Sequence, residues 1–298
     1  MNTSSYFIKD KALFGGYPNN DNIEYFENIG VEYFVNLTSD KDNIKPYHTT
    51  KTCINFPIQD RKTPDSIRRF SSFLLHLLKL IKESKSTEKF YIHCKGGHGR
   101  AGIVVACLLT MYENISTGDA LKLTKLYHSK RIEMKDRWRS IGSPQTYSQK
   151  KFVHDLFNPI VFTNVSNGFK SGLSNLSNHS VIIDGIVYEN AELAYHCLQM
   201  NTTHNKNINT KNIYYIRKHY ESKYYTNHNQ KVQLMEKIIR QKYQKNYDTR
   251  ENLLNIGLRK IVYNSQRDTF WGSNKDIGDN NLGVILTKIK NEYLLQLY

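Results

Sequence analysis

The segment HCKGGHGR, residues 93–100, constrains this chain more than any other, because it lies between two apolar runs of different character. Residues 90–92 predict a strand and residues 103–109 predict a helix. The glycines between them allow successive backbone N–H groups to turn toward one point, and the helix N-terminus adds its dipole. The sequence therefore predicts an anion-binding loop between a strand and a helix of an α/β fold.

Two side chains in this segment indicate what the anion site could do. Arg100 can donate a pair of parallel hydrogen bonds to two phosphate oxygens. Cys94 would lie at the floor of a positive pocket, where we expect a thiolate at neutral pH. A thiolate held beneath a phosphate is a nucleophile aimed at phosphorus. The alternative is a buried structural cysteine, for which Arg100, His98 and Lys95 would be poor neighbours.

With this loop the chain resembles the cysteine-dependent protein-tyrosine and dual-specificity phosphatases, over roughly residues 8–157. The resemblance implies an α/β phosphatase domain in which helices flank a central sheet. It also implies a phospho-cysteine intermediate on Cys94 and a reaction that needs no metal or cofactor. The phosphate-binding residues that it implies are Lys95, Gly96, Gly97, His98, Gly99 and Arg100.

The segment 56–60 resembles the stretch of these phosphatases that ends in the general acid. The resemblance implies that Asp60 protonates the leaving oxygen and then deprotonates the attacking water. An ordinary loop aspartate is the alternative. Asp65 is the second candidate, although it is also well placed to cap the helix that apolar spacing predicts over residues 67–81.

The segment 143–149 resembles the family's glutamine segment, which places the hydrolytic water. We favour Gln149 for that role and keep Gln145 as the second choice. The alternative is a polar first helical turn opened by Ser143 and Pro144. Ala101 departs from the family, which usually has a hydroxyl residue directly after the arginine to stabilise the departing thiolate. We therefore expect slower breakdown of the phospho-cysteine, without slower attack.

The chain is strongly basic, with a formal net charge of +15 and a pI near 9.4. Residues 122–151 hold nine Lys or Arg residues against two acidic residues, and we expect Lys95 and His98 to add positive charge to the rim of the pocket. These charges favour a multiply anionic substrate: a phosphopeptide, a phosphoinositide, a nucleotide phosphate or an RNA end. A solvated basic face is the alternative.

The four cysteines show no paired spacing and no zinc pattern, which favours a reducing, cytoplasmic location. Residues 1–11 lack the apolar core of a signal peptide. No apolar run approaches the roughly 20 residues of a membrane span. We therefore expect no membrane span.

The second half of the chain has a different organisation. A stretch rich in Asn, Ser and Gly follows Pro159, so we place a boundary there and expect domains over residues 1–157 and 158–298. Beyond it, we expect strands at residues 160–162 and 181–183, a turn at residues 184–185, and helices over residues 188–200, 230–243 and 284–293. Residues 201–212 predict a polar loop.

Over roughly residues 160–295 this half resembles the NADAR (YbiA-like) family, through an ordered set of short motifs. The motifs are Leu173-Ser174-Asn175, a helical glutamate at Glu192, Asp268-x-x-Trp271-Gly272, and Gly278-x-Asn280-x-Leu282-Gly283. The resemblance implies a mainly α-helical domain that cleaves N-glycosidic bonds to ribose-type sugars, in phosphorylated riboflavin-pathway intermediates or in ADP-ribose attached to guanine.

The resemblance implies roles for these residues. Glu192 or Asp268 would stabilise the oxocarbenium character that develops at the sugar. Trp271 would stack on a base or form a wall of the pocket, and ribose or phosphate would be bound by Ser174, Asn175 and Asn280. The alternatives are a salt-bridge partner for Glu192, a core residue for Trp271 and a turn-stabilising residue for Asn280.

This half departs from its family at Gln199, where a lysine is usual, and in residues 261–263, which lack the common glutamate. A domain that binds an ADP-ribose-type ligand without cleaving it is therefore one alternative. The two halves could also act on one pathway of nucleotide derivatives. In the rival interpretation, the second half only recruits a protein phosphatase. A phosphate-binding module with weak turnover is the non-enzymatic alternative.

Overall fold

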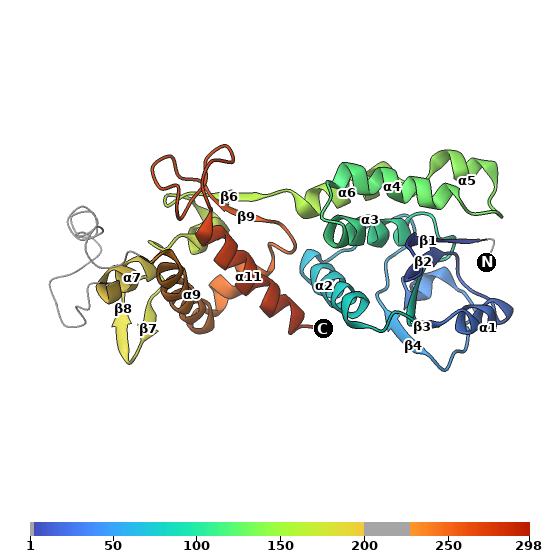
Figure 1. Ribbon diagram of the computed structural model, residues 1–298, viewed down its shortest axis with the longest axis horizontal. Coiled ribbons are helices and arrows are strands. Elements are labelled where there is room, and N and C mark those ends of the chain that lie inside the picture. Colours follow the sequence, from blue (N-terminus) through green and yellow to red (C-terminus); the bar gives the residue numbers. More distant parts are fainter. Residues whose placement is uncertain (1–2, 200–226) are drawn as a thin grey trace. The chain divides into compact units, whose positions relative to one another are not determined.

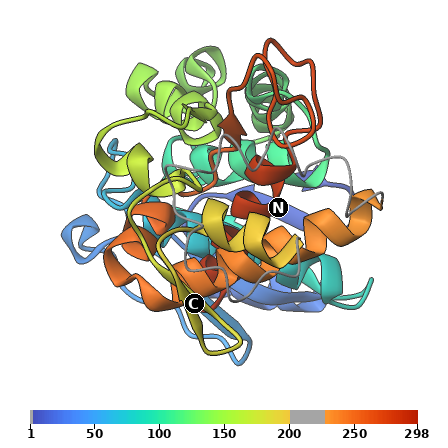
Figure 2. The ribbon, with the colours of Figure 1, turned by 90° about the vertical axis from the view of Figure 1, so that its left-hand side faces the viewer.

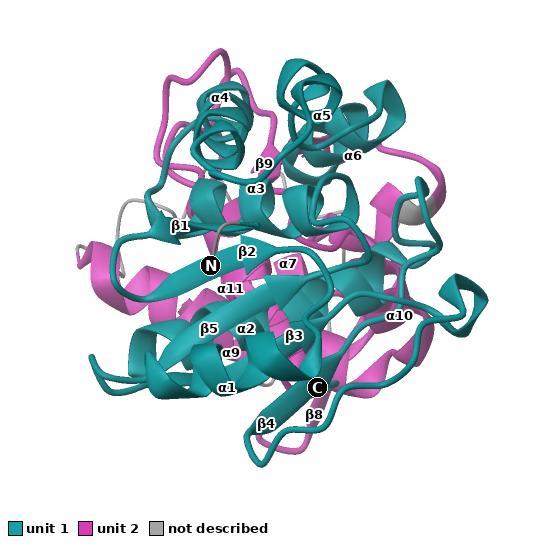
Figure 3. Ribbon diagram, turned by 90° about the vertical axis from the view of Figure 1, so that its right-hand side faces the viewer, with its two compact units in different colours: residues 1–158, 297–298 teal, residues 159–296 magenta. Residues whose placement is uncertain are grey.

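The structure is a computed structural model that describes residues 3–199 and 227–298 (Figure 1). The chain divides into unit 1, residues 1–158 with 297–298, and unit 2, residues 159–296 (Figure 3). Unit 1 contains a five-stranded sheet with the strand order β1-β2-β5-β3-β4. These strands are β1 (Ser4–Ile8), β2 (Ala12–Gly15), β5 (Lys89–His93), β3 (Val31–Asn36) and β4 (Thr52–Asn55).

The sheet is parallel except for β1, which runs antiparallel to β2. The carboxyl ends of β2, β5, β3 and β4 therefore meet at one edge. In open α/β sheets, ligands bind at this edge. The segments that leave β4 and β5 carry Asp60 and the loop that begins at Cys94.

Helices cover both faces of this sheet, because its side chains alternate between two apolar faces. On one face, Leu13, Phe34 and Tyr91 form a core with residues of α1 (Asn20–Asn28). Helix α3 (Arg100–Tyr112) lies against the other face and is buried over its first ten residues. In Figure 3, α4 (Thr117–Ser129) and α6 (Tyr147–Phe157) lie on the outer side of α3. This unit has the phosphatase-like α/β fold that the sequence predicted.

Helix α2 (Ile67–Glu83) confirms the helix predicted from apolar spacing. Its buried side includes Phe70, Phe73, Leu74 and Leu77. The prediction of Asp65 as its cap is wrong. Ser66 directly precedes the first helical residue, and its hydroxyl accepts a hydrogen bond from the Arg69 amide at 3.2 Å.

Unit 2 is mainly helical. Its helices α7 (Ala191–Gln199), α9 (His228–Lys245), α10 (Tyr247–Leu254) and α11 (Asn281–Leu295) enclose a common apolar core. Figure 2 shows α7 in yellow beside α9 in orange. Strand β6 (Ile160–Phe162) pairs in parallel with β9 (Ile261–Tyr263), which confirms the strand predicted at residues 160–162. The helices predicted over residues 230–243 and 284–293 lie within α9 and α11.

A hairpin joins β7 (Val181–Ile183) to β8 (Ile186–Tyr188). Its two turn residues, Asp184 and Gly185, have φ angles of +50° and +81°. This conformation matches the twist of a two-residue hairpin. The helix predicted from residue 188 begins at Ala191, because Tyr188 is the last residue of β8 and pairs with Val181 of β7. The predicted end of that helix at residue 200, and the predicted loop at 201–212, lie outside the described residues.

No helix in the described ranges 3–199 and 227–298 is long and apolar enough to cross a membrane.

Candidate active site

The loop of residues 94–99 connects β5 to α3, so it lies at the carboxyl edge of the sheet. Gly97 has a φ of +72°, and a Cβ there would come within 2.3 Å of the carbonyl carbon of Gly15. The loop therefore packs on the backbone that follows β2, and only glycine fits at this contact. Gly99 is the N-cap residue of α3, and Arg100 is its first helical residue.

Cys94 lies at the start of this loop and is 2% exposed. It lines a pocket of about 190 Å³. The pocket brings together most of the residues predicted for the phosphatase site: Asp60, Cys94, Lys95, Gly96, His98, Gly99 and Gln145. Arg61 and Trp138, which the sequence analysis did not select, complete its lining.

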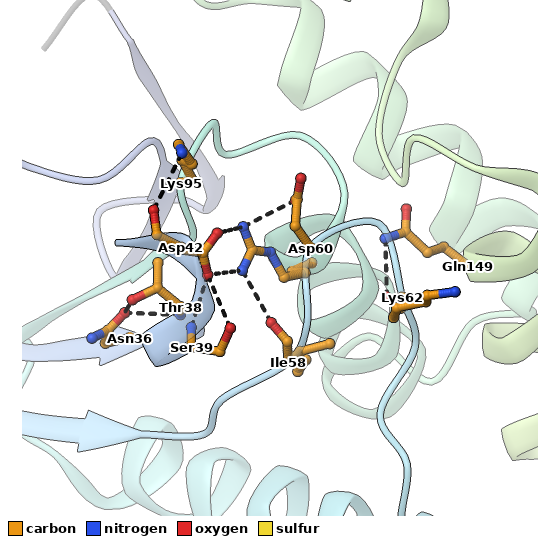
Figure 4. Close-up of polar contacts among 10 residues, drawn as sticks. Asn36, Thr38, Ser39, Asp42, Ile58, Asp60, Lys62, Lys95 and Gln149 are labelled. Atoms are coloured by element: carbon orange, nitrogen blue, oxygen red, sulfur yellow. Dashed lines mark hydrogen bonds and ion pairs between the residues drawn. The ribbon is translucent and has the colours of Figure 1, made fainter. Parts of the chain in front are cut away.

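Arg100 is held rigidly at this site and is 1% exposed. Its two terminal nitrogens donate to the carboxylate of Asp42 at 2.6 and 2.9 Å, and one of them also donates to the carbonyl of Ile58 at 3.0 Å. Figure 4 shows Asp42, Ile58 and Asp60 around this guanidinium group. The buried Nε has no hydrogen-bond partner among the described residues. A buried donor of this kind needs a partner. Arg100 and Gly97 are the predicted phosphate-binding residues that do not line the 190 Å³ pocket.

Asp42 is another residue that sequence reasoning missed. Burial raises its pKa, but hydrogen bonds from Arg100 and Ser39 outweigh burial and hold the pKa below its ordinary value. Asp42 ends the short 3-10 turn Asp40–Asp42 and accepts a hydrogen bond from the Ser39 amide at 2.8 Å. The Ser-x-x-Asp spacing of residues 39–42 was the available signal. It indicates a capping box and says nothing of a partner 58 residues away.

Asp60 also contacts Arg100, with an ion-pair distance of 3.0 Å, yet its side chain is 61% exposed. It lies on the segment that follows β4, beside Ile58. Asp60 is therefore both anchored to the arginine and open to the solvent side of the pocket. Asp65, the second candidate for the general acid, is not part of the pocket lining.

The two candidate glutamines have different positions. Gln149 is buried, and its side-chain oxygen accepts hydrogen bonds from the amides of Gln145 and Thr146, both at 3.1 Å. Its amide nitrogen donates to the carbonyl of Lys62 at 3.2 Å. Gln145 lines the pocket. The alternative of a helix opened by Ser143 and Pro144 is wrong, because α6 begins at Tyr147 with Thr146 as its N-cap residue.

His98 does not add the predicted positive charge to the rim, and this prediction is wrong. Burial, with Arg131 nearby, lowers its pKa to about 4, so the ring is neutral at neutral pH. Its Nδ1 is 2.8 Å from Nε2 of His128, whose pKa is lowered to about 3, mainly by burial. His98 also stacks on Trp138, with ring centroids 4.9 Å apart. Lys95 is exposed, so it can supply charge at the rim.

Arg131 holds the loop of residues 94–99 against β2. It donates to the carbonyls of Gly97 at 3.0 Å and Phe14 at 3.1 Å, which ties the loop to β2. Burial lowers its pKa to about 10, so it stays charged at neutral pH. The sequence analysis counted Arg131 only as part of a basic stretch. Nothing in its local sequence indicates that it is buried.

Unit 2 has a larger pocket of about 760 Å³. Two residues predicted for the second site, Asp268 and Trp271, line it together with Gln199. The cationic residues Lys231 and Arg267 also contribute to the lining. Asp268 accepts a hydrogen bond from the Trp271 amide at 2.8 Å, so its carboxylate also shapes the loop that presents the tryptophan.

The other residues predicted for this second site do not line the pocket. Glu192 is buried on α7, and its Oε1 lies 3.2 Å from Nε2 of His196. Ser174 accepts a hydrogen bond from the Leu176 amide, and the amide of Asn175 contacts Met235. The binding roles predicted for these residues stay predictions.

Asn280 binds the backbone of β9. It accepts from the Tyr263 amide at 2.9 Å and donates to the carbonyl of Ile261 at 2.9 Å. Its φ of +53° places it in the left-handed region, where Asn is tolerated. These contacts match the turn-stabilising alternative.

Two protein-family models match the chain, one within each of its two units. Residues 8–153 match the family "Swiss Army Knife protein, DSP-PTPase phosphatase domain", and residues 161–294 match the NADAR domain. The chain is 32% identical over 290 residues to "Putative tyrosine phosphatase 197R" of Invertebrate iridescent virus 6, covering 95% of this chain and 89% of that protein. It is 42% identical over 160 residues to "Putative tyrosine phosphatase 067L" of Invertebrate iridescent virus 3, covering 53% of this chain and 66% of that protein.

Two solved structures are similar to separate parts of the chain. The crystal structure of Tk-PTP in its active form is 21% identical, with a TM-score of 0.41, and the match covers 52% of this chain and 95% of that one. The NMR structure of the E. coli protein YbiA is 17% identical, with a TM-score of 0.41, and the match covers 47% of this chain and 89% of that one. The matches to the two domain families and to the viral tyrosine phosphatase 197R show that the chain belongs to the tyrosine phosphatase family of hydrolases, with a phosphatase domain of the dual-specificity type followed by a NADAR domain.

Proposed function

We propose that unit 1 hydrolyses phosphate monoesters on the tyrosine, serine or threonine residues of proteins through a phospho-cysteine intermediate. One observation carries this proposal. A buried arginine, fixed by Asp42, forms an ion pair with Asp60, and Asp60 lines one small pocket together with Cys94. That combination supplies an anion clamp, a nucleophile and a proton donor.

In the first step, the Cys94 thiolate attacks phosphorus, a sulfur–phosphorus bond forms and the phosphorus–oxygen bond to the substrate breaks. Asp60 transfers its proton to the leaving oxygen. Arg100 and the amides of the loop donate hydrogen bonds to the three equatorial oxygens, where negative charge is held during transfer. The free Nε of Arg100 suits this role.

In the second step, water attacks the phosphorus of phospho-cysteine, and Asp60 accepts a proton from that water. The sulfur–phosphorus bond breaks, which releases inorganic phosphate and restores the thiolate. Gln145 lines the pocket, whereas the amide of Gln149 is bonded on both sides, so the contacts favour Gln145 for placing the water. Ala101 offers no hydroxyl to the departing thiolate, so this step limits turnover.

The direct test is phosphate release by the full chain from a panel that contains a phosphotyrosine peptide, a phosphoinositide, ADP-ribose phosphate and an RNA 5′ end. The proposal predicts preference for the peptide and complete loss of turnover in Cys94→Ser. Cys53→Ser is the matched control, because Cys53 is exposed and outside the pocket. A Cys94→Ser variant with wild-type turnover would disprove the proposal. Preference for ADP-ribose phosphate or RNA would favour a nucleotide-type phosphatase.

We propose a second activity for unit 2, the cleavage of an N-glycosidic bond in an ADP-ribose-type compound. The observation in its favour is the large pocket that combines Asp268 and Trp271 with the cations Lys231 and Arg267. A carboxylate beside the sugar stabilises positive charge at the anomeric carbon, the cations suit phosphates, and the tryptophan suits a base.

Guanine release from ADP-ribosylated guanine tests this second proposal. Asp268→Asn should lose release, whereas Asp276→Asn, an exposed control outside the pocket, should keep it. Binding without release by the wild-type chain would show a binding domain and would agree with the glutamine at position 199.

A further inference from the structure

A second pocket lies next to the Cys94 pocket. It has a volume of about 370 Å³, and its lining includes Tyr17, Pro18, Ile44, Pro46, Tyr47 and Lys95. Lys95 lines both pockets. The proposed phosphatase chemistry does not use this second pocket, which we name the tyrosine–proline pocket.

The same segments that build the Cys94 site form the walls of the tyrosine–proline pocket. The Tyr17 amide donates to the carbonyl of Lys95 at 3.1 Å, which fixes one wall to the loop. The other wall begins at Ile44, two residues after Asp42, whose carbonyl accepts a hydrogen bond from Lys95 Nζ at 3.4 Å. A substrate whose phosphate lies over Cys94 can therefore extend past Lys95 into this pocket.

The two tyrosines contribute carbon surface to the lining, because their hydroxyl groups are used elsewhere, whereas Asn19, Asn20, Lys45 and Lys95 form its polar part. The hydroxyl of Tyr47 lies 2.8 Å from Nε2 of His93, and the hydroxyl of Tyr17 bonds to the backbone of Tyr47. Burial raises the pKa of both tyrosines, so both are neutral at neutral pH. The two rings lie 5.2 Å apart, and with two prolines and Ile44 they offer carbon surface to an occupant.

This chemistry distinguishes between two kinds of occupant. A nucleobase has a polar edge that needs hydrogen-bond partners. Asn19, Asn20 and Lys45 also line this pocket, and the side-chain oxygen of Asn19 already accepts from the Asn22 amide at 2.8 Å. An aliphatic or aromatic side chain needs only carbon contacts. Grooves lined by aromatic residues and prolines bind peptides in this way.

We infer that the tyrosine–proline pocket binds an apolar side chain next to the phosphorylated residue of a protein substrate. This inference rests on the proposed phosphatase function and names its substrate class. The pocket selects peptides with a flanking Leu, Pro or Phe, while Lys95 remains beside the phosphate.

The experiment compares kcat/KM for phosphopeptides that carry Leu or Asp at the positions flanking the phosphorylated residue, with p-nitrophenyl phosphate as a substrate that reaches only the Cys94 pocket. Wild-type protein should prefer the Leu peptide by about tenfold or more, as expected for an apolar side chain in an apolar pocket. Ile44→Asp and the milder Ile44→Ser should remove that preference and leave hydrolysis of p-nitrophenyl phosphate unchanged. Ile132→Asp is the matched control, because Ile132 is 78% exposed and outside the pocket.

The outcomes distinguish a failure of this inference from a failure of the proposed phosphatase function. Wild-type hydrolysis of p-nitrophenyl phosphate without any peptide preference would overturn the inference and leave the phosphatase proposal intact. No hydrolysis of any substrate would overturn both. Preference for a nucleoside 5′-phosphate over the peptides, lost in Ile44→Asp, would show that the pocket takes a base and would also overturn the inference.

Discussion

Asp42 and Arg100 form a buried, two-point ion pair at the carboxyl edge of the sheet, with nitrogen–oxygen distances of 2.6 and 2.9 Å. The pair joins the segment that follows β3 to the first residue of α3. Arg100 cannot swing away while this pair is intact. The orientation of the anion clamp therefore depends on a residue that need not touch the phosphate.

The first prediction concerns this pair. Asp42→Asn keeps the shape of the side chain but removes the charge that compensates Arg100. Loss of one partner of a buried pair costs about 3 kcal/mol of unfolding free energy. A displaced clamp should lower kcat/KM by about a hundredfold. Urea unfolding and steady-state kinetics measure the two effects. Asp119→Asn breaks an exposed pair with Lys122 and should change neither. Wild-type kinetics in Asp42→Asn would contradict the positioning role.

The second prediction separates the roles of the two aspartates that contact Arg100. Asp60→Asn should lower kcat by about a hundredfold or more for a phosphotyrosine peptide, whose leaving oxygen needs a proton. The same variant should lose much less with p-nitrophenyl phosphate, whose leaving group departs without one. Asp65→Asn should behave as wild type with both substrates. Equal losses with both substrates in Asp60→Asn would argue against the general acid.

The third prediction concerns Ala101. Ala101→Ser supplies a hydroxyl directly after Arg100, where it can stabilise the departing thiolate of Cys94 during the second step. We expect kcat to rise by about tenfold and the initial burst of leaving group to shrink, because breakdown of the intermediate no longer limits turnover. Stopped-flow measurement of the burst tests this. A wild-type burst with no rise in kcat would show that another step limits turnover.

The fourth prediction concerns pH and the neutral pair His98 and His128. Their folded pKa values are about 4 and about 3, against an ordinary value of 6.5, so below pH 6.5 the unfolded chain binds more protons than the folded one. The stability from the neutral rings is therefore fully present above pH 6.5 and is lost as the pH falls toward 4. Unfolding free energies measured across this window should fall with pH. The fall should be smaller in His98→Gln than in His48→Gln, an exposed control. Ring signals of His98 that titrate near pH 6.5 in NMR spectra would contradict this.

The sequence predicted the parts of the site that are local in the chain. The strand, the glycine loop and the helix at residues 90–109 follow from apolar runs and glycines within a short window, and the structure has them there. The helix predicted over residues 67–81 follows from apolar spacing in the same way, and the structure extends it to Glu83.

The parts of the site that could not be predicted from the sequence depend on contacts between segments that are distant in the chain. Asp42 and Arg131 reach the site from the segments that follow β3 and α4, and their charges look like ordinary surface charges in the sequence. The neutrality of His98 follows from burial under Trp138 and His128, which no local pattern indicates. Gln149 completes the capping box of α6, in which its side-chain oxygen accepts from the Thr146 amide, and its amide nitrogen is occupied by the carbonyl of Lys62, 87 residues away.

The most direct test of the account is to quench the full chain with acid during turnover of a phosphotyrosine peptide and to map the phosphoryl group by mass spectrometry. The account predicts a phosphoryl group on Cys94 that accumulates in the wild-type protein and is reduced in Ala101→Ser. Turnover that proceeds with no phosphoryl group on Cys94 at any time point would contradict the central claim.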